Sequence, residues 1–137
     1  MSPLAGPAAA AGAASWADAV LAAAVLAIDA RGVGGARLRS PAGALRDQWF
    51  AQLRDFLGPD AVLQRMPCQV DDARLLGGID LAASLRSGRP VVERGLLAQC
   101  DGGVLVAQMA ERMSAGMAGR IAAALDQDSL WLSLIHI

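Results

Sequence analysis

Few residues of this chain have the type and spacing that metal or redox chemistry requires. Cys68 and Cys100 lie far apart, with no CxxC pair and no histidine close to either. This spacing argues against a zinc site or a disulfide framework and favours two buried thiols. The acidic pair Asp71 and Asp72 is a weak metal signal, because a cation site needs several oxygen ligands. We therefore predict no metal site and no catalytic residue in this chain.

A glycine run from Gly32 to Gly35 raises the question of a dinucleotide-binding loop. Such a loop follows a strand and opens a helix. Here the run follows an Ala-rich segment of helical character and precedes a short strand, so we interpret it as the end of a helix.

The composition is that of one domain at most, with a sizeable core. Hydrophobic residues make up 55% of the 137 residues, and 12 basic residues stand against 13 acidic ones, for a net charge of −1. That balance argues against nucleic acid and anionic membranes as partners. The apolar stretch 17–28 is too short to span a membrane, and residues 1–14 lack the positive start of a signal peptide. We expect a cytoplasmic protein that opens with a flexible Ala/Gly/Pro leader, residues 1–14.

The last six residues, 132–137, resemble the translated end of a sequencing adaptor. Accidental tails of this kind are set aside in fold reasoning. We therefore expect the native protein to continue beyond Trp131 and His136 to have no function. The alternative is a genuine C-terminal strand.

Apolar periodicity and turn residues predict alternating helices and strands, which indicates an α/β domain with a largely parallel sheet. The run 104–107 is apolar without alternation, which suits a strand buried on both faces. Because the chain stops soon afterwards, we expect this strand to keep an unpaired edge. Helices are expected over 15–29, 44–57, 79–85, 95–100 and 109–125, strands over 36–39, 61–66, 90–92 and 104–107, and a polar loop over 71–78.

Two motifs in the middle of the chain resemble a known family. The first runs from Asp72 to Asp80 and reads DARLLGGID, and the second, from Gly95 to Ala98, reads GLLA. Together with the glycine run, the strand after it and the segment 88–91, these motifs are similar to the AAA+ module of magnesium chelatase. They match its D subunit better than its ATPase subunit, called I. The resemblance covers about residues 16–125.

The resemblance implies a P-loop NTPase (AAA+)-like fold, in which helices flank a parallel sheet. The later elements of that fold are missing, so it is incomplete here. Residues 15–131 would then form a partial, degenerate ATPase-like domain.

The family's phosphate-binding loop (Walker A) has the form G-x-x-x-x-G-K-[ST]. On this sequence its first glycine falls on Ser40, its last on Leu45, its lysine on Arg46 and its hydroxyl residue on Asp47, and only Gly43 is kept. Such a loop needs glycine torsions and no side chain against the phosphates. Leu45 adds a bulky group there, and Asp47 places a carboxylate at the helix N-terminus where a phosphate would bind.

The strand that carries the family's Walker B acids shows a second loss. Gln108 and Met109 follow the strand where the family has Asp and Glu. Neither side chain holds Mg²⁺ or polarises a water as a carboxylate does. The nearest acid, Glu111, falls two residues too late, inside the expected helix. We therefore expect an inactive ATPase-like module with no cofactor of its own.

The resemblance also implies partners and a role. In the family, the I subunit hydrolyses ATP as a ring and the D subunit forms a second ring on it. The large H subunit inserts Mg²⁺ into protoporphyrin IX for chlorophyll or bacteriochlorophyll synthesis. This chain would then be a platform between the motor and the chelating subunit, with ATP and Mg²⁺ used by the complex. Two alternatives stay open: an ATPase that binds nucleotide through an atypical loop, and an interaction domain unrelated to chelatase.

Overall fold

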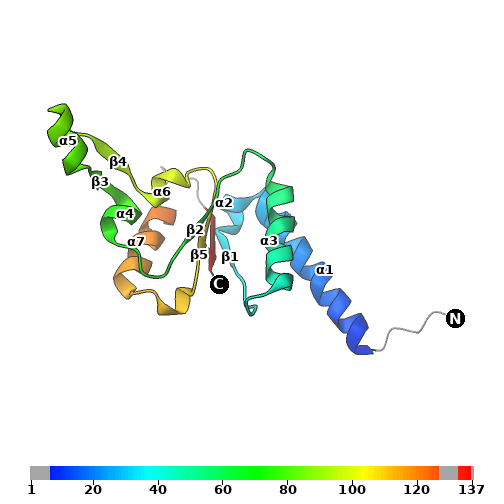
Figure 1. Cartoon of the computed structure of the whole chain (residues 1–137). Helices are drawn as coiled ribbons and strands as arrows, with labels where there is room; N and C mark the ends of the chain where they lie inside the picture. The colour runs from blue at the N-terminus through cyan, green and yellow to red at the C-terminus, as the bar shows by residue number, and fades with distance from the viewer. Residues whose placement is uncertain (1–6, 127–132, 137) are drawn as a thin grey trace.

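The computed structural model describes residues 7–126 and 133–136, so residues 1–6 of the predicted leader, 127–132 and Ile137 lie outside the described part. Its centre is a four-stranded sheet (Figure 1). Every neighbouring pair of strands is parallel, which confirms the predicted α/β class. The strand order is β1 (Gly35–Arg37), β6 (Ser133–His136), β5 (Val104–Ala107) and β2 (Leu63–Met66).

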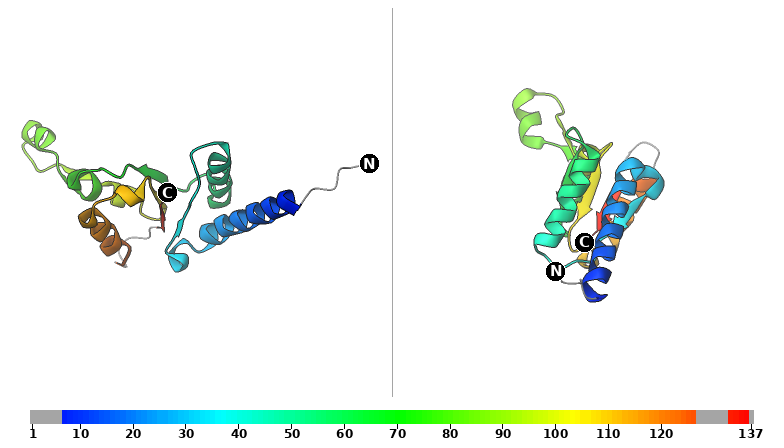
Figure 2. Two further views of the ribbon diagram at one scale, coloured as in Figure 1. Left: turned by 90° about the horizontal axis from the view of Figure 1, so that it is seen from below. Right: turned by 90° about the vertical axis from the view of Figure 1, so that its right-hand side faces the viewer.

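Helices α1 (Pro7–Ile28) and α3 (Ala44–Leu57) lie on one face of the sheet (Figure 2). Their buried residues pack in one cluster with Val104 and Val106 of β5. Burying apolar side chains in this way stabilises a fold by about 25 cal/mol for each Å² removed from water.

Aromatic contacts fix how α1 and α3 pack together. The indole Nε1 of Trp49 donates a hydrogen bond to the carbonyl of Ala19 at 2.8 Å. Phe50 stands edge-on to Trp49 with ring centroids 5.3 Å apart, and the Arg65 guanidinium lies 5.4 Å from the Phe50 centroid. Because its polar atom is satisfied inside the protein, Trp49 can be buried without an unpaired donor.

The opposite face of the sheet is covered by α4 (Asp72–Leu76), α6 (Leu96–Gln99) and α7 (Ala115–Asp126). Leu105 and Ala107 of β5 point into this second cluster. Successive β5 side chains therefore enter opposite cores, which explains why the run 104–107 contains no polar residue.

Several predicted elements are found with shifted ends. The prediction for α3 is confirmed at both ends. α1 begins at Pro7 rather than after Ser15. α5 (Leu81–Ser87) begins later than predicted, because the carboxylate of Asp80 accepts a hydrogen bond from the Ala83 N–H at 2.9 Å and caps the helix there.

A short helix, α2 (Ala30–Val33), follows α1 within the segment expected to end that helix. Its N-cap is Asp29, whose carboxylate accepts a hydrogen bond from the Gly32 N–H at 2.8 Å. Gly34, in the left-handed conformation at φ 73°, ends it, so the glycine run does close a helix before β1.

The prediction of a loop over 71–78 is wrong, because α4 and the start of β3 (Gly77–Ile79) lie there. The Asp71 carboxylate accepts a hydrogen bond from the Arg74 N–H at 2.7 Å, which caps the helix. Leu75 is fully buried in the core. One apolar anchor in a polar stretch gives too little periodicity for a sequence to show a helix.

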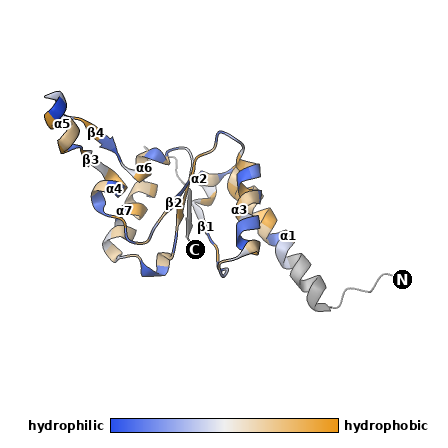
Figure 3. Cartoon of the chain, in the orientation of Figure 1, coloured by the Kyte–Doolittle hydropathy of each residue, from blue (hydrophilic) through white to orange (hydrophobic). Residues whose placement is uncertain are grey.

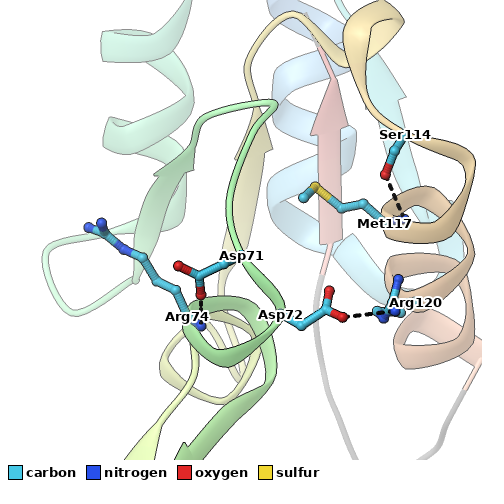
Figure 4. A network of polar contacts seen from close by, with 6 residues as sticks. All are labelled: Asp71, Asp72, Arg74, Ser114, Met117 and Arg120. Atoms are coloured by element: carbon cyan, nitrogen blue, oxygen red, sulfur yellow. Dashed lines mark hydrogen bonds and ion pairs between the residues drawn. The ribbon is translucent and has the colours of Figure 1, made fainter.

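The predicted helix over 109–125 is broken into two pieces. A short 3₁₀ turn, η1 (Ala110–Arg112), precedes α7. Met109 adopts a left-handed conformation, at φ 50° and ψ 48°, which no helix can continue through. α7 begins afresh where the Ser114 hydroxyl accepts a hydrogen bond from the Met117 N–H at 3.2 Å (Figure 4).

The expected unpaired edge of β5 is also wrong. The backbone of β6 pairs with β5 on one side and β1 on the other, with Leu105 opposite Leu134 and Ala36 opposite Ile135. Residues 133–136 of the suspected adaptor tail thus occupy the middle of the sheet. Ladder hydrogen bonds use only the backbone. The non-native origin of this tail therefore stays a prediction.

A hairpin module projects from this body (Figures 1 and 2). It consists of residues 77–94, in which β3 pairs antiparallel with β4 (Val92–Arg94) and α5 lies between them. In the part of the chain that the structure describes, no helix has the length and apolar character to cross a membrane.

Candidate functional site

The loop between β1 and α3 has the strand–turn–helix order expected for the degenerate phosphate loop. Gly43 is the N-cap of α3 at φ 153° and ψ −178°, a backbone conformation that is essentially reserved for glycine. It makes no side-chain cap, and Ser40 turns its hydroxyl toward the Pro41 carbonyl at 3.2 Å. The loop thus leaves the first N–H groups of α3 without a side-chain acceptor.

The three substituted loop positions occupy the first turn of α3. Leu45 is 62% exposed, Arg46 is half-buried and Asp47 is exposed. The Asp47 backbone N–H donates to the Gly43 carbonyl at 3.1 Å, so this turn is regular helix. A carboxylate in the first turn favours the positive end of the helix dipole. The position that an anion would use therefore carries a negative charge.

The other half of the site lies at the carboxyl end of β5. The Gln108 N–H donates to the Met66 carbonyl at 2.9 Å and extends the pairing of β5 with β2. The chain then turns sharply at Met109, whose side chain is half exposed. A left-handed non-glycine residue costs about 1–2 kcal/mol, so this turn is held against strain.

One cavity of about 380 Å³ brings these two segments together. Its walls are Ser40 and Arg46 from the loop side, and Gln108, Met109 and Glu111 from the end of β5. The sequence thus predicted four of the five lining residues. Glu111 was noted only as an acid inside a helix. Because the left-handed turn at Met109 breaks that helix, Glu111 faces the same cavity as Arg46.

The remaining predicted loop positions do not line this cavity. Leu45 lines a second, mostly apolar cavity of about 350 Å³ together with Trp16, Leu38 and Trp49, on the α1 side of the loop. Ser40 and Arg46 border both cavities. Gly43 and Asp47 line neither of the two.

These residues do not fit Mg²⁺-bound ATP as a hydrolytic site does. The two positions after β5 carry an amide and a thioether, and neither supplies the hard oxygen charge that Mg²⁺ prefers. Among residues 7–126 and 133–136 no group of three His, Cys, Asp or Glu side chains is placed to hold a metal. Leu45 also gives a Cβ-bearing residue to the position where a phosphate loop needs glycine.

The motif from Asp72 to Asp80 has a structural role in anchoring the hairpin module. Asp72 on α4 forms an ion pair of 2.8 Å with Arg120 on α7 (Figure 4). Both side chains are partly exposed, so the pair contributes at most about 1 kcal/mol. Leu75 fills the core beneath α4, and Asp80 caps α5. The motif therefore fixes where β3 leaves the body.

The second motif meets the first at the base of the hairpin. A methyl group at Gly95 would overlap the backbone of Leu75, Leu76 and Gly77. Gly77 approaches the Glu93 carbonyl equally closely and has a φ of 89°. Two glycines that touch in this way explain why both motifs contain glycine at these points.

The two thiols are buried, as predicted. Cys68 is 8% exposed and Cys100 is fully buried, and both are free. Desolvation by burial raises the pKa of the Cys100 thiol to about 11. A thiol held protonated in this way is a poor nucleophile, which agrees with a structural role.

Comparison with known proteins gives one consistent relationship. The chain is 45% identical over 103 residues to the magnesium-chelatase 60 kDa subunit of Rhodobacter capsulatus, a match that covers 75% of this chain and 18% of that subunit. It is 43% identical over 102 residues to the 60 kDa subunit of Cereibacter sphaeroides, covering 74% of this chain and 17% of the relative.

A more distant match is the magnesium-chelatase 67 kDa subunit of Chlorobaculum parvum, 35% identical over 81 residues, or 59% of this chain and 13% of the relative. No family model and no solved structure matches the chain. The chain thus spans less than a fifth of the length of the curated relatives it matches. The relationship that the motifs indicated is confirmed, and the chain is homologous to a segment of the D subunits of magnesium chelatase.

Proposed function

We propose that this chain is the non-hydrolysing AAA+ ring module of a magnesium chelatase D subunit. In this role it is a platform for the ATP-driven insertion of Mg²⁺ into protoporphyrin IX in chlorophyll or bacteriochlorophyll synthesis. Its partners are the AAA+ ATPase of the chelatase and the large porphyrin-binding component, in a cytoplasmic complex. The relatives' names and the parallel α/β sheet support this assignment.

The observation that carries the proposal is the cavity at the end of β5. It unites the loop before α3 with the β5 terminus, as a nucleotide site would, yet Gln108 and Met109 stand where acids are needed. Catalysis of phosphoryl transfer depends on positioned Mg²⁺ and on a group that orients the attacking water. With both acids lost, the module keeps the shape of an ATPase domain and serves assembly.

A second candidate function is an atypical nucleotide-binding ATPase. The observation in its favour is that Arg46 and Glu111 line the same cavity, so one cation and one acid are present there. Glu111 lies in the 3₁₀ turn rather than directly after the strand, which separates it from the positions used by hydrolytic acids.

Phosphate release with Mg²⁺-bound ATP and the affinity for a fluorescent ATP analogue decide between the two. The native chain should show no turnover above background. The variant Leu45→Gly/Arg46→Lys/Asp47→Ser should gain analogue affinity without turnover, because it restores the loop and not the acids. The matched control, Arg54→Lys/Asp55→Ser, makes the same charge changes at the other end of α3 and should gain nothing.

Turnover by the native chain that is lost in Glu111→Gln would reject the proposal in favour of the atypical ATPase. If the restored loop gains no affinity, the backbone has left the phosphate-loop shape, and the domain must be assigned without a nucleotide-site ancestry.

A further inference from the structure

The hairpin module exposes apolar side chains at its far end. Ile79 and Val92 lie opposite each other in the β3–β4 ladder, so their side chains share one face of the ribbon. Leu81 and Leu85 are four residues apart on α5 and share one helix face. These four side chains are 60–84% exposed. Together with Arg86 and Arg89 they are called the hairpin tip.

The hairpin tip is held on a braced scaffold. The Asp80 N–H donates to the Val91 carbonyl at 2.9 Å, and the Val91 N–H donates to the Ser84 hydroxyl at 2.8 Å. These bonds tie α5 to both strands of the hairpin. Apolar side chains grouped on an ordered projection mark an interaction surface, because exposing them to water is unfavourable.

The charge of the hairpin tip is positive, because Arg86 and Arg89 belong to it. Of the two acids in the hairpin module, Asp80 has its carboxylate engaged in capping α5. Glu93 follows Val92 in β4 and therefore points to the other face of the ribbon. Each arginine adds only about 1 kcal/mol of attraction to an anionic membrane, so two do not hold a protein there. The surface that fits this tip is an apolar protein surface with carboxylates beside it.

Such a surface exists on α1 of the same chain. Leu21, Val25 and Ile28 are 63%, 46% and 85% exposed and follow one another at helical spacing. Asp18 precedes them by one turn, and Asp29 follows directly. These five residues, called the α1 stripe, extend over roughly 15 Å of helix at about 1.5 Å per residue. The opposite side of α1 packs on α3.

The two surfaces cannot meet within one molecule. The hairpin tip and α1 lie at opposite ends of the fold (Figure 1), and apolar colouring is visible on both (Figure 3). We propose that the hairpin tip of one copy packs on the α1 stripe of a second copy, with Arg86 and Arg89 facing Asp18. A contact between two different surfaces is head-to-tail, and repeating it builds rings or filaments. The inference does not depend on the proposed function.

Sedimentation velocity of the full chain over a range of concentrations tests the contact. The native chain should self-associate. Leu81→Gln/Leu85→Gln, which removes the tip, and Leu21→Gln/Val25→Gln, which removes the stripe, should each weaken association by more than about tenfold. All four residues are exposed, so the variants should fold, and circular dichroism with thermal unfolding checks this.

Mixing the two variants is the decisive step. Each retains one intact surface, so the mixture should form a one-to-one complex and nothing larger. The charge variant Arg86→Glu/Arg89→Glu should also fail to associate, and it should regain binding to a partner that carries Asp18→Arg. A control, Phe56→Gln, changes an exposed apolar residue on α3 outside both surfaces and should leave association unchanged.

Three results overturn the proposal. One is a native chain that stays monomeric at every concentration. Another is a mixture of the two variants that forms no complex, which would indicate a symmetric contact or a different partner. The third is loss of association in Phe56→Gln, which would indicate nonspecific aggregation.

Discussion

At the scale of single residues, two backbone conformations bracket the cavity at the end of β5. Gly43 holds a torsion that other residues rarely adopt, and Met109 holds a left-handed one without being glycine. Strained residues persist where the surrounding structure over-determines them, and they gather at functional sites. The cavity therefore retains the backbone geometry of a site although its side chains have lost the chemistry.

Cys100 gives a prediction for alkaline pH. Its pKa is raised from 9.0 to about 11 by burial, so the unfolded chain loses this proton at lower pH than the folded chain. The stability that the protonated thiol provides is complete below pH 9 and is lost as the pH rises toward 11. The loss should be on the order of 2 kcal/mol, measured by urea unfolding at several pH values.

The chain suits this measurement because it contains no lysine and no tyrosine. Between pH 9 and 11 the titrating side chains are thus the two thiols, since arginine titrates above about pH 12. Cys100→Ala should flatten the profile, whereas Cys68→Ala should keep the fall attributed to Cys100. An unchanged slope in Cys100→Ala would show that another process governs alkaline unfolding.

At the scale of elements, the base of the hairpin module depends on close approach of two backbones. Gly95→Ala should cost about 1–3 kcal/mol and displace the hairpin, because its methyl group meets backbone that cannot move aside easily. Gly78→Ala is the matched control, since a methyl group there meets open space. Thermal unfolding of both variants checks the difference, and equal midpoints would mean that the base is loosely packed.

Local patterns predicted those elements whose causes are local. α3 has its apolar residues at helical spacing and glycine at each end, so both of its ends could be read from the sequence. α4 could not, because its one strong signal is the burial of Leu75 in the core. The broken helix after Met109 depends on a backbone conformation that methionine rarely adopts. Glu111 was missed as a cavity residue for the same reason.

At the scale of the whole molecule, closure of the sheet depends on β6. Ile135 pairs with Ala36 on one side and Val106 on the other, so its backbone stands at the centre of the sheet. Ile135→Pro removes an N–H from a central strand, which sheets rarely tolerate. We expect the unfolding midpoint to fall by at least about 5 °C. Ile135→Val keeps the N–H and should melt close to the native chain; equal melting of the proline variant would exclude β6 from the folded sheet.

The position of β6 also bears on how the chain folds during synthesis. β1 and β5 are both complete before residue 133 is made, yet they touch only through the strand that follows them. A nascent chain must therefore hold two open strand edges apart until its last segment leaves the ribosome. Such late, distant pairing slows folding and leaves intermediates prone to aggregation. A pause in translation before residue 133 would present a gap in the sheet to chaperones.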